Sequence, residues 1–426
     1  MKPPAKVAAC KRKRGPLHIG AAGCGGKPAW LNQNRMSSSS KLAEFAARLR
    51  GAIQACFSLG KPAPAGLPQF DALARELFAL QFELNLPYRR FCEAGEWRPC
   101  DIGHWTAIPT MPTGAFKDCE LSCLPARERT TVFHSSGTTG HRPSRHYHNS
   151  ASLAVYEASL LGWFRAHVPM ASGLQRRWHM TILTPPPAQA PHSSLVHMFE
   201  TIRRELGGES SAFVGKTAED GGWSLDSEAA LQRLRDQTGD GQPVLVLGTA
   251  FSYVHLLDYM AERGLRFALP AGSCALETGG YKGRSRSLPR TALHGLISQR
   301  LGISPDHIIC EYGMSELSSQ AYDITGDQWP VTRDPAVSAH ESHIARHFFF
   351  PPWARVQIIS PETGHEVAEG QTGLIRVFDL ANVFSVLAVQ TEDLGIRRGA
   401  GFELIGRAAL AEPRGCSLMN VELLNR

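Results

Sequence analysis

The sequence has the length and composition of an ordinary globular protein. Its 426 residues are 43% hydrophobic and 20% charged, which excludes a disordered or fibrous chain. The formal charge of +6 comes from the beginning of the chain, because eight of the 45 basic residues and none of the 39 acidic ones precede Met36. The remainder is nearly neutral. A nucleic-acid-binding face needs clustered positive charge, so no nucleic-acid partner is expected.

The first 36 residues are rich in glycine and proline. We expect them to be a disordered extension, or an upstream stretch of a chain that starts at Met36. The basic run at residues 11–14 is not followed by the apolar stretch of a secretory signal. Nowhere does an apolar run approach the roughly 18 residues of a membrane span. The sequence therefore predicts a cytoplasmic protein without a membrane span.

Cysteines and histidines are scattered without metal-binding spacing. The 10 cysteines contain no CxxC pair, which favours free thiols over a disulfide framework or a zinc site. His141, His146 and His148 lie close together in the sequence. Such a group is more typical of a solvated loop than of a metal site, and we expect a loop here.

Apolar periodicity predicts helices in the region 37–128, which we expect to be mainly helical. Apolar residues recur at three- and four-residue intervals from Leu42 to Ile53, with Ser40 as the expected N-cap. A second helix is predicted over residues 70–84. A stretch rich in proline and glycine, residues 60–68, connects the two helices.

Beyond residue 129, short apolar runs alternate with helix-length segments. Strands are predicted at 131–133, 180–183 and 244–247, and helices at 151–165, 195–206 and 253–263. This alternation predicts an α/β fold in which helices cover both faces of a parallel sheet, over residues 129–330. Strands without intervening helices are predicted at 355–359, 374–378 and 402–405. Residues 331–426 are therefore expected to form a smaller β-rich lobe.

The strongest local signal directly follows the first of these predicted strands. It reads His-Ser-Ser-Gly-Thr-Thr-Gly, and its candidate phosphate-binding residues are Ser135, Ser136, Gly137, Thr138, Thr139 and Gly140. Glycines let a backbone approach an anion, and hydroxyls add hydrogen-bond donors. The run is not a Walker A loop, because His141 rather than lysine follows Gly140. Taken alone, such a run is more often an ordinary loop.

Four further motifs follow in a fixed order along the chain. They are Thr278-Gly279-Gly280, Tyr312-Gly313-Met314-Ser315-Glu316, Thr391-Glu392-Asp393-Leu394-Gly395 and Gly406-Arg407. Together with the Ser/Thr/Gly loop, this series resembles the signature motifs of the adenylate-forming enzyme superfamily. The resemblance implies an enzyme that activates a carboxylic acid with ATP and Mg²⁺ as an acyl-adenylate.

The resemblance also implies a role for each motif. Gly279 and Gly280 would lie beside the adenine, and Tyr312, in the motif with Gly313 and Ser315, would stack on it. Asp393 would bind the ribose hydroxyls.

At the phosphate end, Glu316 would hold Mg²⁺ and Arg407 would meet charge that develops on the phosphate. Each residue has a structural alternative. Glu316 would otherwise be a capping or surface acid, Tyr312 an ordinary core residue, Asp393 a turn residue and Arg407 a surface ion-pair partner.

Within this superfamily, the chain resembles the acyl-protein synthetase family. The resemblance rests on residues 277–284 (Glu-Thr-Gly-Gly-Tyr-Lys-Gly-Arg), 191–194 and 414–418, and on the short segment after Arg407, which contains no lysine. It implies a fatty acid substrate, acyl transfer to Cys416 and a fatty acid reductase subunit as partner. Lys282 and Arg284 are the candidates to replace the lysine that a mobile C-terminal lobe supplies elsewhere in the superfamily. A structural role, or binding of the substrate carboxylate, stays open for both residues.

Two other functions stay open. One is a single-lobe acyl- or aryl-CoA ligase that resembles phenylacetate-CoA ligase and uses CoA as the acyl acceptor. The other is a non-catalytic, nucleotide-binding scaffold. Dependence on Cys416 distinguishes the acyl-protein synthetase from the CoA ligase. Any exchange of pyrophosphate into ATP with an added carboxylate excludes the scaffold.

Overall fold

The computed structural model describes residues 37–57, 67, 69–135, 142–168, 177–219, 221–239, 241–281, 285–325 and 346–407. Contacts group the described residues from Ser38 onward into one compact unit. Eight predicted site residues lie outside the described residues: Ser136, Gly137, Thr138, Thr139, Gly140, Lys282, Arg284 and Cys416.

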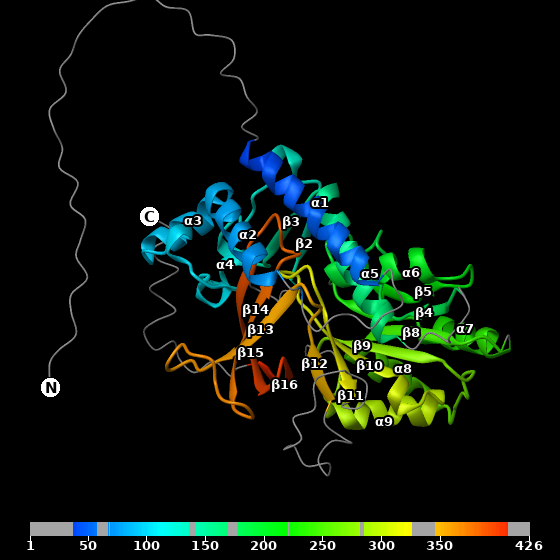
Figure 1. The fold of residues 1–426 in the computed structure, drawn as a ribbon. Coiled ribbons are helices and arrows are strands. Elements are labelled where there is room, and N and C mark those ends of the chain that lie inside the picture. Colours follow the sequence, from blue (N-terminus) through cyan, green and yellow to red (C-terminus); the bar gives the residue numbers. More distant parts are fainter. Residues whose placement is uncertain are drawn as a thin grey trace, which may run out of the picture. The chain divides into compact units, whose positions relative to one another are not determined.

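A single mixed sheet forms the centre of this unit (Figure 1). Among the described residues it has 12 strands in the order β13-β14-β15-β16-β12-β11-β10-β9-β8-β4-β5, and β1 pairs with β15. The strands are β1 (Met111–Pro112), β4 (His179–Ile182), β5 (Ala212–Phe213), β8 (Val244–Thr249), β9 (Cys274–Thr278), β10 (Ile308–Tyr312), β11 (Ala321–Thr325), β12 (Arg346–Phe349), β13 (Ala354–Ile359), β14 (Thr372–Asp379), β15 (Ala388–Arg398) and β16 (Gly401–Arg407).

The half of the sheet from β10 to β5 is parallel and covered on both faces. Leu245 and Leu247 of β8 pack into the core that contains α1, α5 and α6, whereas Val244 and Val246 pack into the core of α7, α8 and α9. Figure 1 shows these two groups of helices on opposite sides of the strands. Strands buried on both faces are continuously apolar, as this one is. The predicted α/β fold is confirmed.

Five of the longer helices lie where the sequence predicts helices: α1 (Ser38–Phe57), α2 (Phe70–Leu84), α5 (Ser150–His167), α6 (Ser194–Leu206) and α8 (Ala250–Glu262). Three more were not predicted, namely α3 (Leu86–Ala94), α7 (Ser227–Gly239) and α9 (Arg290–Leu301); α4 (Ala115–Asp118) is a single turn. The predicted N-cap Ser40 is wrong, because α1 begins at Ser38 and Ser40 lies inside it. Clear side-chain caps are Asn149 on α5, Ser193 on α6 and Thr249 on α8.

The predicted strand at 131–133 does not join the central sheet. It forms β2 (Thr131–His134), which pairs antiparallel with β3 (Arg145–His148) in a separate two-stranded sheet. The expectation that it begins the parallel series is wrong, because β3 follows closely enough in the chain to take up its ladder hydrogen bonds. Another two-stranded sheet joins β6 (Gly215–Thr217) to β7 (Trp223–Leu225).

The C-terminal strands are antiparallel and extend the same sheet. β11, β12 and β16 link the parallel half to β15, β14 and β13. This β-rich part therefore continues the sheet of residues 129–330, the predicted nucleotide-binding part. The division of the chain near residues 128 and 330 stays a prediction. Among the described residues, no helix is both long and apolar enough to cross a membrane.

Candidate active site

The end of β2 and the start of β3 form the base of the predicted phosphate loop. The backbone N–H of Ser144 donates to the hydroxyl of Ser135 (3.0 Å), and the N–H of Ser135 donates to the Ser144 carbonyl (3.4 Å). The N–H of His134 donates to the carbonyl of His192 (2.8 Å), and the two imidazole rings lie 4.8 Å apart. The segment that contains His192 therefore lies directly against the start of the loop.

A short chain of contacts joins this base to the predicted metal-binding acid. The hydroxyls of Ser144 and Ser315 lie 3.3 Å apart, and the Ser315 hydroxyl donates to Oε2 of Glu316 (2.9 Å). Nδ1 of His146 lies 2.9 Å from the Ser315 carbonyl. Glu316 is 6% exposed, and no described residue donates a hydrogen bond to its other oxygen, Oε1. Two motifs far apart in the sequence thus meet at one place.

His146 and His148 are buried rather than solvated. Both lie on β3, where they pack against Phe116 and Phe133 respectively. Burial lowers the pKa of His146 to about 4 and the pKa of His148 well below its ordinary value. The predicted solvated loop is wrong for these two residues, because pairing with β2 turns their side chains into the core; His141 lies outside the described residues.

Tyr312 and Asp393 are in direct contact. The Tyr312 hydroxyl donates to Oδ2 of Asp393 (2.9 Å), although the residues lie on β10 and β15. The Tyr312 ring packs edge-on against Phe402 (5.3 Å), Phe348 and Phe350 (6.2 Å each). Burial raises the pKa of both Tyr312 and Asp393. The turn alternative for Asp393 is wrong, because the residue lies within a strand.

Arg407, the last residue of β16, lies beside Asp393. Its Nε is 3.8 Å from Oδ1 of Asp393, and its side chain is 82% exposed. An ion pair this exposed contributes little to stability. The preceding residue, Gly406, has a φ of +134°, a backbone conformation that favours glycine.

The Thr278-Gly279-Gly280 segment begins at the last residue of β9, and both of its glycines are exposed. Gly279 has a φ of +69°, and a Cβ at Gly279 or Gly280 would meet no atom of the described residues within 4 Å. The Thr278 hydroxyl donates to the buried carboxylate of Glu311 on the neighbouring strand. A Cβ at Gly313 would overlap Oε1 of Glu311, so a larger residue there would displace the end of the Glu311 side chain. Open space over these glycines permits close approach of a ligand.

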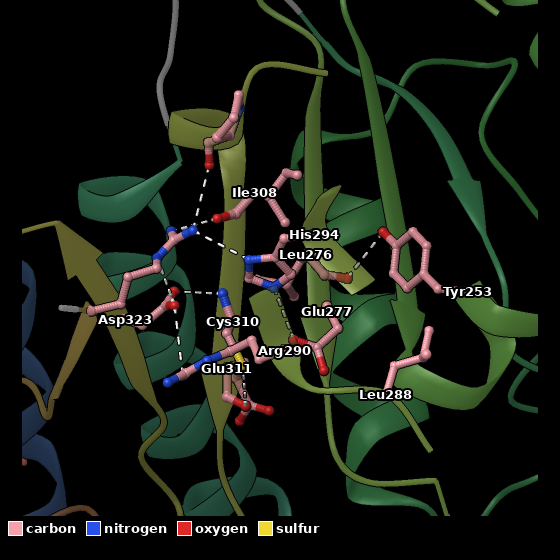
Figure 2. A network of polar contacts seen from close by, with 12 residues as sticks. Tyr253, Leu276, Glu277, Leu288, Arg290, His294, Ile308, Cys310, Glu311 and Asp323 are labelled. Carbon is pink, nitrogen blue, oxygen red and sulfur yellow. Dashed lines mark hydrogen bonds and ion pairs between the residues drawn. The ribbon is translucent and has the colours of Figure 1, made fainter. Parts of the chain in front are cut away.

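A buried charged network lies beneath these motifs and was missed by the sequence analysis (Figure 2). Nε2 of His294 lies 3.5 Å from Glu277, and Asp323 accepts the N–H of Cys310 (2.6 Å). Burial, together with the neighbouring Glu277, raises the pKa of Glu311 to about 7, against a hydrogen bond from Thr278 that lowers it. The available signal was the acid in the apolar run Ile-Ile-Cys-Glu-Tyr, where a charged residue is otherwise unexpected.

Comparison with known proteins identifies the family. Residues 68–424 match the family described as Acyl-protein synthetase, LuxE. The chain belongs to the acyl-protein synthetase family. The prediction of an enzyme of this class is therefore confirmed.

Curated relatives of this family member agree with the assignment. Over 361 residues the chain is 22% identical to the long-chain-fatty-acid--luciferin-component ligase of Vibrio harveyi, which covers 81% of this chain and 85% of that protein. The protein of the same name from Aliivibrio fischeri is 20% identical over 368 residues and covers 84% and 89% respectively.

Solved structures place the fold among adenylate-forming ligases. A 2-hydroxyisobutyryl-CoA ligase in an open conformation, in complex with 2-HIB-AMP and CoA, has a TM-score of 0.56 at 14% identity, over 80% of this chain and 77% of that one. The same ligase in its postadenylation state has a TM-score of 0.55, over 87% and 69%. At this identity the likeness concerns the fold of the synthetase.

Proposed function

We propose that the chain activates a long-chain fatty acid with ATP as an acyl-adenylate and passes the acyl group to a protein cysteine. The family and the names of the curated relatives support this function. The observation that carries it is the contact chain from Ser135 through Ser144 and Ser315 to Glu316. It places a carboxylate next to the base of a loop suited to phosphates.

Magnesium fits the residues at this end of the site. Mg²⁺ prefers oxygen ligands and is commonly held by one or two carboxylates together with substrate phosphates. Glu316 is a nearly buried carboxylate with Oε1 free of described hydrogen-bond donors. When bound there, Mg²⁺ would neutralise phosphate charge that otherwise repels the attacking carboxylate of the fatty acid.

The nucleoside would lie at the other end of the site. Tyr312 holds one oxygen of Asp393, and Arg407 lies near the second, so both carboxylate oxygens face groups that favour the ionised form. An ionised carboxylate can accept hydrogen bonds from both ribose hydroxyls. The open space over Gly279 and Gly280 would take the adenine, and the Tyr312 ring would line it.

The residues proposed for acyl transfer lie outside the described part of the chain. Cys416 is the proposed thioester-forming nucleophile, because thiolates are strong nucleophiles at neutral pH. Lys282 and Arg284, only a few residues after Gly280, are the proposed cations for the α-phosphate. A fatty acid reductase subunit is the proposed acceptor.

Exchange of pyrophosphate into ATP tests the adenylation step. With a long-chain fatty acid added, Glu316→Gln and Asp393→Asn are each expected to lower the exchange rate about 100-fold or more, because each removes a charged ligand of the nucleotide or its metal. Glu392→Gln is the matched control, since Glu392 is exposed and adjacent to Asp393. Wild-type exchange in either site variant would refute the assignment of that residue.

Intact-protein mass spectrometry tests the transfer step. After incubation with ATP, Mg²⁺ and a mixture of fatty acids, we expect a mass increase of one acyl group that hydroxylamine removes. Cys416→Ser should lose this adduct but retain exchange, whereas the control Cys100→Ser, at an exposed cysteine, should keep it. No adduct, combined with ATP consumption that requires CoA, would instead indicate a CoA ligase.

A further inference from the structure

The loop that carries Glu316 pairs with no strand in the described part of the chain. Residues 313–320 connect β10 to β11, yet Ser315, Glu316, Ser318 and Ser319 are all buried. Buried backbone groups outside a ladder need other hydrogen-bond partners. One turn bond, from the N–H of Leu317 to the carbonyl of Met314, is made within the loop. The remaining partners come from other parts of the chain.

Asp379, at the end of β14, supplies the acceptors. Its Oδ2 accepts the backbone N–H of Ser318 (3.0 Å), and its Oδ1 accepts the hydroxyl of Ser319 (2.7 Å) and the N–H of Ala381 (2.9 Å). The carboxylate is 0% exposed. No ion pair of Asp379 is found among the described residues, so neutral donors alone hold it. Burial of a carboxylate without a counter-ion costs free energy, which these hydrogen bonds must offset.

Asn382 supplies the donor on the other side of the loop. Its Nδ2 donates to the carbonyl of Glu316 itself (2.9 Å) and to the carbonyl of Val386 (3.0 Å). Gln81 of α2 holds Asn382 in turn, because its Nε2 donates to the Asn382 carbonyl (2.8 Å). The main chain is therefore fixed at Glu316 and again two residues later, at Ser318.

We infer that Asp379 and Asn382 are positioning residues that fix the direction of the Glu316 carboxylate for a metal–nucleotide complex. This inference rests on the proposed function, in which Glu316 holds Mg²⁺. Neither residue touches the carboxylate, so both act through the backbone of the loop. Groups that orient a metal ligand commonly change metal affinity by about 10- to 100-fold when they are removed.

Asp379→Asn is the first test variant. The carboxamide is nearly the same size, but its NH₂ group would face the N–H of Ser318 or the other donors, so the loop must shift. Asn382→Ala is the second variant, and it frees the Glu316 carbonyl. The matched control is Thr181→Val, an isosteric change that breaks the buried hydrogen bond from Thr181 to Gln237 (2.8 Å) on β4, away from this loop.

Two Mg²⁺ dependences are measured for each variant. The first is the half-saturating Mg²⁺ concentration of pyrophosphate exchange. The second is ATP affinity by calorimetry, without fatty acid, at limiting and at saturating Mg²⁺. We expect each test variant to raise the half-saturating concentration about 10-fold and to weaken ATP binding at limiting Mg²⁺ only. Thr181→Val should change neither the half-saturating Mg²⁺ concentration nor ATP affinity. Loss of folded protein lowers the maximal rate but does not change the half-saturating concentration.

The outcomes separate this inference from the proposed function. If folded Asp379→Asn and Asn382→Ala show the same Mg²⁺ dependence as the wild-type protein, the inference is overturned. Adenylation still stands in that case, provided that the wild-type protein catalyses the exchange. Absence of wild-type exchange refutes adenylation, but a shifted Mg²⁺ dependence of ATP binding would still support the positioning role. An equal shift in Thr181→Val would overturn the inference, because general destabilisation would then account for it.

Discussion

Asp323 and Asp379 are both fully buried, and they are held in opposite ways. Asp323 accepts the N–H of Cys310 and forms ion pairs with Arg346 (2.8 Å) and Arg290 (3.9 Å). Asp379 accepts hydrogen bonds from two backbone N–H groups and one hydroxyl. Among the described residues, arginines balance the charge of Asp323, whereas only neutral donors contact the Asp379 carboxylate.

The two carboxylates stabilise different parts of the molecule. Burial raises the pKa of both residues, but arginines oppose the rise at Asp323, whereas only hydrogen bonds oppose it at Asp379, whose pKa is about 6. Its two ion pairs connect Asp323 of β11 to Arg346 of β12 and to Arg290 of α9. Asp379 instead ties β14 to the loop that carries Glu316, so its interactions serve the site.

Substitution of Asp323 is expected to lower the free energy of unfolding the most. Asp323→Asn leaves Arg346 and Arg290 partly buried without their counter-charge, and we expect a loss of about 3–5 kcal/mol in the free energy of unfolding, measured by urea denaturation. A loss below about 1 kcal/mol would show that solvent already compensates the two arginines, and the contrast with Asp379 would fail.

An intermediate effect is expected at Glu311, whose carboxylate accepts one hydroxyl hydrogen bond among the described residues. Its pKa of about 7 in the folded protein lies above its ordinary value, so the folded state holds the proton more tightly than the unfolded state. Its stabilising contribution is complete below about pH 4.5 and is lost as the pH rises through about 7. Glu311→Gln should therefore gain up to about 3 kcal/mol relative to wild type between pH 4.5 and pH 8. Parallel stability profiles of the two proteins across this range would contradict the prediction.

The smallest expected effect is at Asp379. Asp379→Asn removes the cost of burying a charge without a counter-ion but also weakens its hydrogen bonds, so the two changes largely cancel. We expect the free energy of unfolding at pH 7 to stay within about 1 kcal/mol of wild type. Denaturation of Asp379→Asn beside Asp323→Asn gives the comparison directly, and equal losses in the two variants would remove the distinction between the sites.

Local patterns predicted much of the fold. The helix at 70–84 agrees with α2, and the strands at 180–183, 244–247 and 374–378 fall on or within one residue of β4, β8 and β14. These elements follow from apolar periodicity, which is a property of neighbouring residues. The order of the motifs indicated the superfamily, and residues 277–284, 191–194 and 414–418, with the short segment after Arg407, indicated the family that the comparison then showed.

Contacts between distant residues were not predictable in this way. The burial of His146 depends on pairing with β2, and the polar pattern of β3 resembles that of a loop. Asp379 and Asn382 act on residues more than 60 positions away, so no spacing rule indicates them. Glu311 was visible as an acid in an apolar run, but its partner Thr278 lies on another strand.

The overlap between Glu311 and a Cβ at position 313 has a consequence for evolution. The end of the Glu311 side chain fills the space that a side chain at position 313 would need, so a larger residue there would require Glu311 to move. A related sequence that replaces Glu311 with a small residue loses this steric reason for glycine at position 313. The two positions are thus expected to covary among homologues, and alanine at position 313 should accompany a shortened side chain at position 311.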